Sequence, residues 1–424
     1  MRFVFSVILL LLFASQASAF CGFYVAKADG SLYNQSSKVV FVRDGNRSVI
    51  TMSSDYRGAP ADFAMVVPTP KVLRRDQIQT VDAKIVAHLD SYTAPRLVEY
   101  FDHDPCTPMV MESPIVVEEA APQSGARKQS LQSRARAKGV TIKAQYAVGQ
   151  YDILILKAKE SDGLATFLTG EGYKLPQGAE LVLADYIDAG MKFFVAKVNL
   201  SRHAKGKSQE LPPLQIAFRS KSFMLPIQLG KLNADKAQDA LFFMLSRKGR
   251  IEVANYRAKE LPSNGNVPVF VEKVFPQFYK ATFTKAVGRG GGIVMEYAWD
   301  MAWCDPCAAD PLPNADLRAL GVRWARGNGT AQDVYVTRYH AQYSKGQMQK
   351  DLVFRETGNK QNFQGRYVMN HPFEGSLNCD AGRQYVRETK KRLAQEAKYL
   401  SGLTGWSVSS INNNIRKTVP AAYR

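Results

Sequence analysis

The sequence predicts an α+β fold, made mostly of antiparallel β-sheet, with several short helices and a C-terminal amphipathic helix. Short apolar blocks and alternating apolar positions recur over most of the chain, which is typical of strands. Helical spacing of apolar residues is confined to short stretches and to one longer stretch near the end. The composition, with 46% hydrophobic and 22% charged residues, is that of an ordinary globular protein.

Residues 1–19 have the pattern of an export signal peptide. Arg2 supplies a short positive region, residues 3–13 are almost uniformly apolar, and Ala17-Ser18-Ala19 is a small-residue cleavage site. The apolar run is well short of the ~20 residues that span a bilayer, so cleavage after Ala19 is favoured over a retained membrane anchor. We therefore expect a periplasmic or secreted protein, with no transmembrane helix in the mature chain.

Residues 20–104 predict an N-terminal β/α unit. Residues 38–52 are rich in Val, Ile and Phe on both sides of the turn Asp44-Gly45-Asn46, which predicts a hairpin. A third strand is expected at 62–67. The apolar spacing then becomes helical, on one face shared by Val81, Ile85, Leu89 and Tyr92. Pro95 predicts the start of a second short helix, over 95–101.

Residues 105–139 predict a flexible linker or projecting loop. Strand and helix periodicity disappears here, and Pro, Ala, Ser and Gln dominate. Acidic residues come first, and a basic run from Arg127 to Lys138 follows. Such a segment buries too little apolar surface to offset the entropy lost on ordering it. It is therefore the best candidate for a domain boundary.

Residues 140–275 predict a β-rich middle region, and residues 276–424 a C-terminal region with a CxxC motif and the terminal helix. The expected strands of the middle region are 140–157, 193–200, 214–218, 222–227, 240–245, 250–256 and 267–274, with helices at 162–168 and 179–190. The expected C-terminal strands are 293–303, 331–343 and 364–370, with a short helix at 314–320. Four residues share one face of the final helix, over 383–400 and ended by Gly402: Val386, Leu393, Ala397 and Leu400.

Five cysteines are disulfide candidates in an exported protein: Cys21, Cys106, Cys304, Cys307 and Cys379. An odd number leaves one thiol over. Because Cys21 and Cys106 flank the first β/α unit, we expect them to pair. Cys304 and Cys307 either pair with each other or divide, with one of them bonded to Cys379.

The segment Trp303-Cys304-Asp305-Pro306-Cys307 resembles a thioredoxin-type redox site. That chemistry needs a helix directly after the first cysteine, whereas Pro311 and Pro313 interrupt this one. Asp305 also disfavours a neighbouring thiolate, because it is a second negative charge. A structural disulfide is therefore favoured over redox activity or a metal site. Cys304 and Cys307 remain the candidate catalytic residues of an alternative function as a thiol-disulfide oxidoreductase.

Asp102, His103 and Asp104 offer metal ligands at close spacing. In a strand, Asp102 and Asp104 would share a face while His103 points away, so a polar turn is favoured over a metal site. The glycine-rich segment 288–292 lacks the GKS/T ending and the following helix of a phosphate loop, so it predicts a hairpin loop. No cofactor is expected. Three other histidines are expected to be core or interface residues: His88, His340 and His371.

The chain resembles a bacterial family known as DUF2330, whose function is uncharacterised. The resemblance rests on eight segments spread along the mature chain: Phe20 to Ala26, Phe63 to Pro70, Ala94 to Cys106, Glu296 to Leu312, Val336 to Tyr343, Asp351 to Phe354, Gln364 to Val368 and Leu403 to Trp406. It implies an exported protein of the bacterial envelope and brings no catalytic residues.

The formal net charge of +18 favours anionic partners. An exported protein meets little nucleic acid, so an anionic envelope surface or an acidic polymer is favoured over nucleic acid as a partner. A solvated cationic surface without a dedicated partner is the alternative, and it is favoured over both. The basic runs Arg127 to Lys138 and Arg383 to Lys398 are the expected contributors. The sequence therefore favours a non-enzymatic binding or structural component of the envelope.

Overall fold

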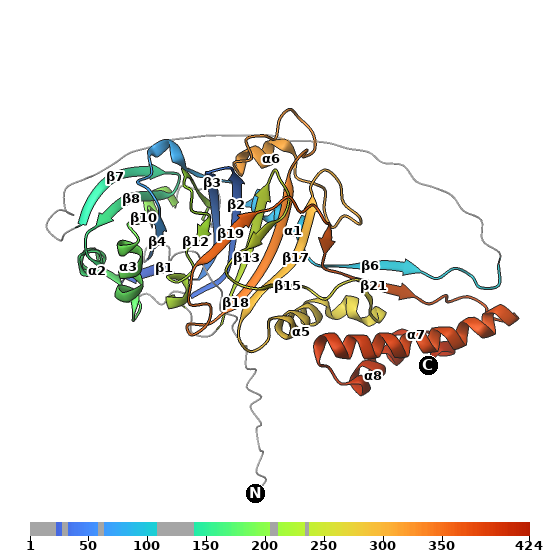
Figure 1. Cartoon of the computed structure of the whole chain (residues 1–424). Coiled ribbons are helices and arrows are strands. Elements are labelled where there is room, and N and C mark those ends of the chain that lie inside the picture. Colours follow the sequence, from blue (N-terminus) through green and yellow to red (C-terminus); the bar gives the residue numbers. More distant parts are fainter. Residues whose placement is uncertain (1–22, 28–32, 58–62, 108–139, 204–210, 234–236) are drawn as a thin grey trace, which may run out of the picture.

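A computed structural model of the chain describes residues 23–27, 33–57, 63–107, 140–203, 211–233 and 237–424 (Figure 1). The fold is α+β with mostly antiparallel sheet, as the sequence predicts. Two large sheets pack face to face, and helices cover their outer faces. The predicted signal peptide, residues 1–19, lies outside the described residues.

The larger sheet has nine strands and is antiparallel except for two neighbouring pairs, β2 with β13 and β15 with β17. Its order is β15-β17-β18-β13-β2-β3-β11-β5, and β20 pairs with β17. The bounds are β2 (Tyr33–Asp44), β3 (Arg47–Arg57), β5 (Ile78–Thr80), β11 (Leu214–Arg219), β13 (Gln238–Ser246), β15 (Ala258–Glu260), β17 (Gly292–Asp300), β18 (Tyr335–Tyr343) and β20 (Phe363–Gln364). Strands from the three predicted regions 20–104, 140–275 and 276–424 therefore share one sheet.

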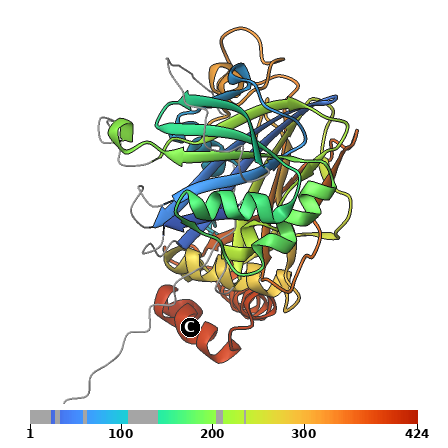
Figure 2. The ribbon, with the colours of Figure 1, turned by 90° about the vertical axis from the view of Figure 1, so that its left-hand side faces the viewer.

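The second sheet has six antiparallel strands in the order β7-β8-β10-β4-β1-β9. Their bounds are β1 (Phe23–Lys27), β4 (Phe63–Thr69), β7 (Val140–Val148), β8 (Tyr151–Ala158), β9 (Tyr173–Lys174) and β10 (Lys192–Val198). Figure 2 shows α2 (Ser161–Gly170) and α3 (Ala179–Asp188), in green, crossing in front of this sheet. Their buried residues Leu164 and Leu183 belong to the core on its outer face.

The alternation of side chains explains why β2 is apolar on both faces. Val39 and Phe41 point into the core between the two sheets. Val40 and Val42 point the other way, into a second core beneath α1 (Ala83–Thr93) and α6 (Asn314–Ala319). Because both faces are covered, an uninterrupted apolar run forms a strand here without an exposed apolar face.

The C-terminal part is a smaller lobe in which helices lie against a short parallel sheet. Its sheet has the order β16-β21-β6, with bounds β6 (Arg96–Phe101), β16 (Gly265–Asn266) and β21 (Arg366–His371). Its helices are α5 (Phe275–Val287), α7 (Asp380–Thr404) and α8 (Val408–Thr418), with the 3-10 helix η5 (Val269–Val274). Figure 1 shows α7 and α8 at one end of the molecule, beside β6 and β21. The remaining elements are β12 (Met224–Leu225), β14 (Ile251–Val253), β19 (Leu352–Glu356), α4 (Leu200–His203), η2 (Arg75–Gln77), η4 (Gly230–Asn233) and η6 (Ala421–Tyr423).

The helix predicted over 95–101 is wrong, because this segment is strand β6. It pairs in parallel with β21 along its whole length, from Arg96 opposite Arg366 to Phe101 opposite His371. The partner strand lies far away in the sequence, so tertiary pairing overrides the local helix-start signal at Pro95.

Two further expectations need correction, and two helices were not predicted. The strand predicted over 267–274 is largely the 3-10 helix η5. Gly402 does not end the final helix, which continues to Thr404 and ends where Gly405 adopts a left-handed conformation with φ of 77°. The helices α5 and α8 were not predicted, because α5 is rich in aromatic and β-branched residues and α8 in asparagine.

The predicted linker 105–139 lies outside the described residues, apart from 105–107. Within the described residues, no helix is both long enough and apolar enough to cross a membrane. The predicted hairpin is confirmed: β2 and β3 meet at Gly45, whose φ of 57° favours glycine.

Candidate functional site

The CxxC motif forms a disulfide in a surface loop between β17 and α6. Cys304 and Cys307 are bonded to each other, which is one of the two arrangements left open by the sequence. Cys307 is exposed and Cys304 is half-buried. The loop is held by Arg96, which donates to the carbonyl of Pro306 over 2.8 Å. The next helix, α6, begins only at Asn314, so no helix N-terminus lies at Cys304 to stabilise a thiolate.

The second disulfide joins Cys106 to Cys379, with their Cα atoms 6.0 Å apart. The expected pair of Cys21 with Cys106 is therefore wrong, and Cys21 lies outside the described residues. The spacing of cysteines in a sequence does not determine which of them pair. In the folded chain, β6 and α7 bring Cys106 and Cys379 together although they are 273 residues apart in the sequence. Cys379 is also the N-cap of α7, where its sulfur accepts from the backbone of Gly382.

Two of the three candidate metal ligands, Asp102 and Asp104, have other partners, and His103 is exposed. Asp102 accepts from Tyr385 and from Arg392, each over 2.6 Å, and so anchors α7 to the end of β6. Asp104 caps the turn that leads to Cys106, whose backbone N–H donates to it. Among the residues that the structure describes, no group of three or more His, Cys, Asp or Glu side chains is arranged to hold a metal ion.

The predicted core or interface histidines each have a polar contact. Nε2 of His88 lies 2.8 Å from the carbonyl of Asp310. His371 contacts the carboxylate of Glu99 over 3.0 Å and stacks on Phe101. His340 is buried within a larger polar network, which the sequence did not predict.

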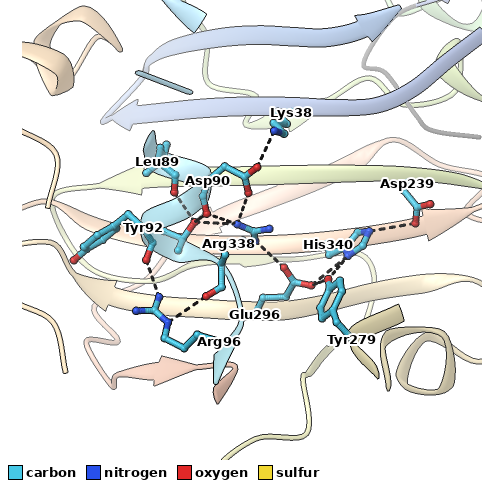
Figure 3. A network of polar contacts seen from close by, with 12 residues as sticks. Lys38, Leu89, Asp90, Tyr92, Arg96, Asp239, Tyr279, Glu296, Arg338 and His340 are labelled. Atoms are coloured by element: carbon cyan, nitrogen blue, oxygen red, sulfur yellow. Dashed lines mark hydrogen bonds and ion pairs between the residues drawn. The ribbon is translucent and has the colours of Figure 1, made fainter. Parts of the chain in front are cut away.

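This polar network is centred on Arg338 of β18 and Glu296 of β17, which form a buried ion pair of 2.7 Å (Figure 3). Glu296 lies at a β-bulge, where the pairing of β17 with β18 shifts register. The bulge lets Glu296 face the same side of the sheet as Arg338. On the other side of Arg338, Asp90 of α1 accepts from it over 2.6 Å and pairs with Lys38 over 2.8 Å.

The network continues from Glu296 to a buried histidine. His340 Nδ1 lies 3.2 Å from Glu296, and its Nε2 lies 3.2 Å from Asp239. Tyr279 of α5 donates to Glu296 and lies 2.6 Å from His340 Nδ1. Three acidic and three basic groups thus alternate from Lys38 to Asp239.

The electrostatics favour the charged form of both central groups. Burial alone would raise the pKa of Glu296, but the charges of Arg338 and His340 lower it to about 2. Burial alone would lower the pKa of His340, but hydrogen bonds with Asp239 and Glu296 raise it above its ordinary value. Each charge is therefore balanced by an opposite one. Such a paired network leaves little hydrogen-bonding capacity for a substrate, so its geometry indicates a structural role.

A cleft of about 550 Å³ on the outer face of β3, β11 and β5 collects positive charge. Six basic side chains line it, from the hairpin, the segment after β4, β11 and the α6 region: Arg47, Lys71, Arg74, Arg219, Arg318 and Arg323. Asp76 is its one acidic lining residue and pairs with Arg74 over 2.8 Å. Among the described residues, the other five basic side chains form no ion pair with an acid. We call this surface the cationic cleft.

Hydrogen bonds to neighbouring residues position two of the cations in the cationic cleft. Arg47 donates to the carbonyl of Gly321 over 3.2 Å, and Arg219 to the side chain of Asn46 over 2.7 Å. Gly321, with φ of 100°, packs so closely on Val49 that a Cβ there would lie 2.8 Å from it. Burial and the neighbouring charges of Arg323 and Arg219 lower the pKa of Arg47, whereas Asp44 raises it.

The sequence did not predict the cationic cleft, because its residues come from separate segments and each resembles an ordinary surface cation. It did predict a basic stretch over Arg383 to Lys398, and Arg383, Arg387 and Lys398 are exposed on α7. A usable signal for the network existed: Glu296, Arg338 and His340 are charged or polar residues within apolar strand segments.

An apolar pocket of about 250 Å³ lies on the opposite face of β3 and β11, between the two large sheets. Its lining has a single hydroxyl and no charged side chain: Ile50, Met52, Val67, Pro68, Pro70, Ala189, Met191, Phe218, Ser222, Met224, Leu225 and Pro226. Neither this pocket nor the cationic cleft is lined by a residue of the polar network.

The buried carboxylate of Glu396 on α7 predicts a pH dependence of stability. Burial raises its pKa from 4.5 to about 7, although Arg392 opposes this. Because its folded-state pKa is the higher one, the contribution of Glu396 to stability is fully present below pH 4.5 and is lost as the pH rises through 7. The loss is about 3 kcal/mol, from ~1.4 kcal/mol per tenfold change in proton affinity.

We expect Glu396→Gln to stabilise the protein by up to about 3 kcal/mol at pH 8 and to change stability little at pH 4, because glutamine carries no charge to bury. Urea unfolding at both pH values measures this. Glu388→Gln, at an exposed position on the same helix, is the matched control and should have little effect at either pH. Equal effects of Glu396→Gln at both pH values would contradict the assignment.

The comparisons with known proteins give a family and no function. No curated protein and no solved structure matches the chain. A family model described as "Uncharacterized protein conserved in bacteria (DUF2330)" matches residues 15–355. This range includes the CxxC loop and every strand of the two large sheets except β20, whereas α7 and α8 lie beyond it. The match extends over more than half of the chain, so the protein belongs to the DUF2330 family of bacterial proteins.

Proposed function

We propose that this protein is an exported component of the bacterial envelope, periplasmic or secreted, that binds an anionic ligand in the cationic cleft and does not act as an enzyme. The cleft carries the proposal, because six basic side chains surround one acid. Arginine predominates among them, and its planar guanidinium suits bidentate binding of phosphate or carboxylate groups.

Charge repulsion within the cleft supports binding of an anion. The positive charges of Arg323 and Arg219 each disfavour the charged form of Arg47, and Asp44 opposes them. A bound anion would relieve this repulsion and satisfy guanidinium donors at the same time. The carboxylate of Asp76 is paired with Arg74, so among the described lining residues no free carboxylate, histidine or cysteine is available as a general base or nucleophile.

Isothermal titration with inorganic pyrophosphate at low salt tests this proposal. We expect binding that weakens steeply as salt is added, because exposed charges are screened within about 8 Å at physiological ionic strength. The double variant Arg219→Gln/Arg323→Gln should weaken binding by about tenfold or more, since a hydrogen bond to a charged group contributes ~1.5–3 kcal/mol.

The matched control removes two exposed cations from α7, by Lys390→Gln/Lys391→Gln. It makes the same change in net charge and should leave pyrophosphate binding unaltered. Absence of binding at low salt, or an equal loss in both double variants, would overturn the assignment of the ligand to the cationic cleft.

Thiol-disulfide exchange at Cys304 and Cys307 is the second candidate, favoured by the exposure of Cys307 and of Trp303, whose side chain is 50% exposed. The missing helix N-terminus at Cys304 opposes it. We expect the purified protein not to reduce insulin disulfides, and Cys304→Ser to leave pyrophosphate binding unchanged. Insulin reduction by the wild-type protein that is lost in Cys304→Ser would establish the exchange activity instead.

A further inference from the structure

The cationic cleft and the apolar pocket meet at one edge of the nine-stranded sheet. Phe218 of β11 lines both. The chain also passes directly from one to the other, because Pro70 lines the pocket and Lys71 lines the cleft. The two cavities therefore lie on opposite faces of the same strand and approach each other at its end.

Among the described strands, none pairs with the outer edge of β11 at this point. β5 pairs with β11 only from Leu214 to Ile216, so residues 217–219 extend beyond it. Gln77 donates to the carbonyl of Ala217 over 2.7 Å, beside this end of the strand. At this end of β11, Phe218 and the Gln77 contact therefore separate the two faces of the sheet, rather than a further paired strand.

The apolar pocket is suited to an alkyl chain. Its floor is buried, with Ile50, Met52 and Leu225 each 4% exposed or less, and its rim is exposed at Ala189 and Ser222. Three methionines line it, and their unbranched side chains adapt to ligands of different shape. An open cavity with no charged group in its lining is filled most favourably by an apolar group.

We propose that the two cavities form one site for an anionic amphiphile, whose alkyl chain occupies the apolar pocket and whose phosphate or carboxylate group binds in the cationic cleft. This inference rests on the proposed function of the cleft and names the class of its ligand. An apolar pocket does not favour an anionic group, and a cationic cleft does not favour a neutral alkyl chain. A ligand with only one of these parts would therefore use only one of the two cavities. Their meeting at Phe218 requires a molecule with both parts.

Octyl phosphate, titrated below its micelle concentration, tests the inference against inorganic phosphate and octanol. Each buried methylene contributes about fourfold in affinity, so octyl phosphate should bind at least about tenfold more tightly than inorganic phosphate. Ala189→Trp at the rim of the pocket should abolish this gain and leave inorganic phosphate binding unchanged, which also shows that the variant is folded. Leu181→Trp, at an exposed position on α3, which ends directly before Ala189, is the control and should keep the gain.

The outcomes separate the inference from the proposed function. Equal affinity for octyl phosphate and inorganic phosphate overturns the inference, while pyrophosphate binding keeps the proposed function. Octyl phosphate binding that Arg219→Gln/Arg323→Gln does not weaken also overturns the inference, because the anionic group then lies outside the cleft. A gain that persists in Ala189→Trp places the chain elsewhere and overturns it as well. Failure of pyrophosphate to bind at all would reject the proposed function itself.

Discussion

The buried ion pair between Arg338 and Glu296 is the constraint on which the arrangement of the sheets and helices depends. Neither charge is stable in the core alone, because removing an ion from water without a partner costs several kcal/mol. Each charged side chain therefore holds the other in position, and the pair holds the helices that contact it. Arg338 holds α1 through Asp90, and Glu296 holds α5 through Tyr279, so one pair joins the nine-stranded sheet to helices from both halves of the chain.

This network and the cationic cleft use charge in opposite ways. In the network, every positive group has a negative partner, so the charges stabilise one packing and leave little capacity for a ligand. In the cleft, Arg47 and Arg323 disfavour each other's charge, and among the described residues neither forms an ion pair with an acid. The remaining charge is therefore available to a molecule from outside. The same nine-stranded sheet carries both, with the central ion pair on β17 and β18 and the cleft on β3, β11 and β5.

Local patterns predicted the elements whose determinants are local. The hairpin turn at Gly45, the apolar β8 and the buried faces of α1 and α7 all follow from spacing within a few residues. Strand β6, the Cys106–Cys379 disulfide and the cationic cleft depend on segments far apart in the sequence, which only the folded chain brings together. The network could be predicted in part. A glutamate within an apolar strand segment indicates that Glu296 is buried with a positive partner, but sequence spacing does not identify that partner as Arg338.

A double-mutant cycle on Arg338 and Glu296, followed by urea unfolding, tests the central claim most directly. The account predicts that Arg338→Met costs about 3–5 kcal/mol, because it leaves Glu296 buried without a partner, and that Arg338→Met/Glu296→Leu regains much of this loss. Arg355→Met, which breaks the solvent-exposed pair with Glu252, should cost less than about 1 kcal/mol. An Arg338→Met variant no less stable than Arg355→Met, or single effects that simply add in the double variant, would contradict the account.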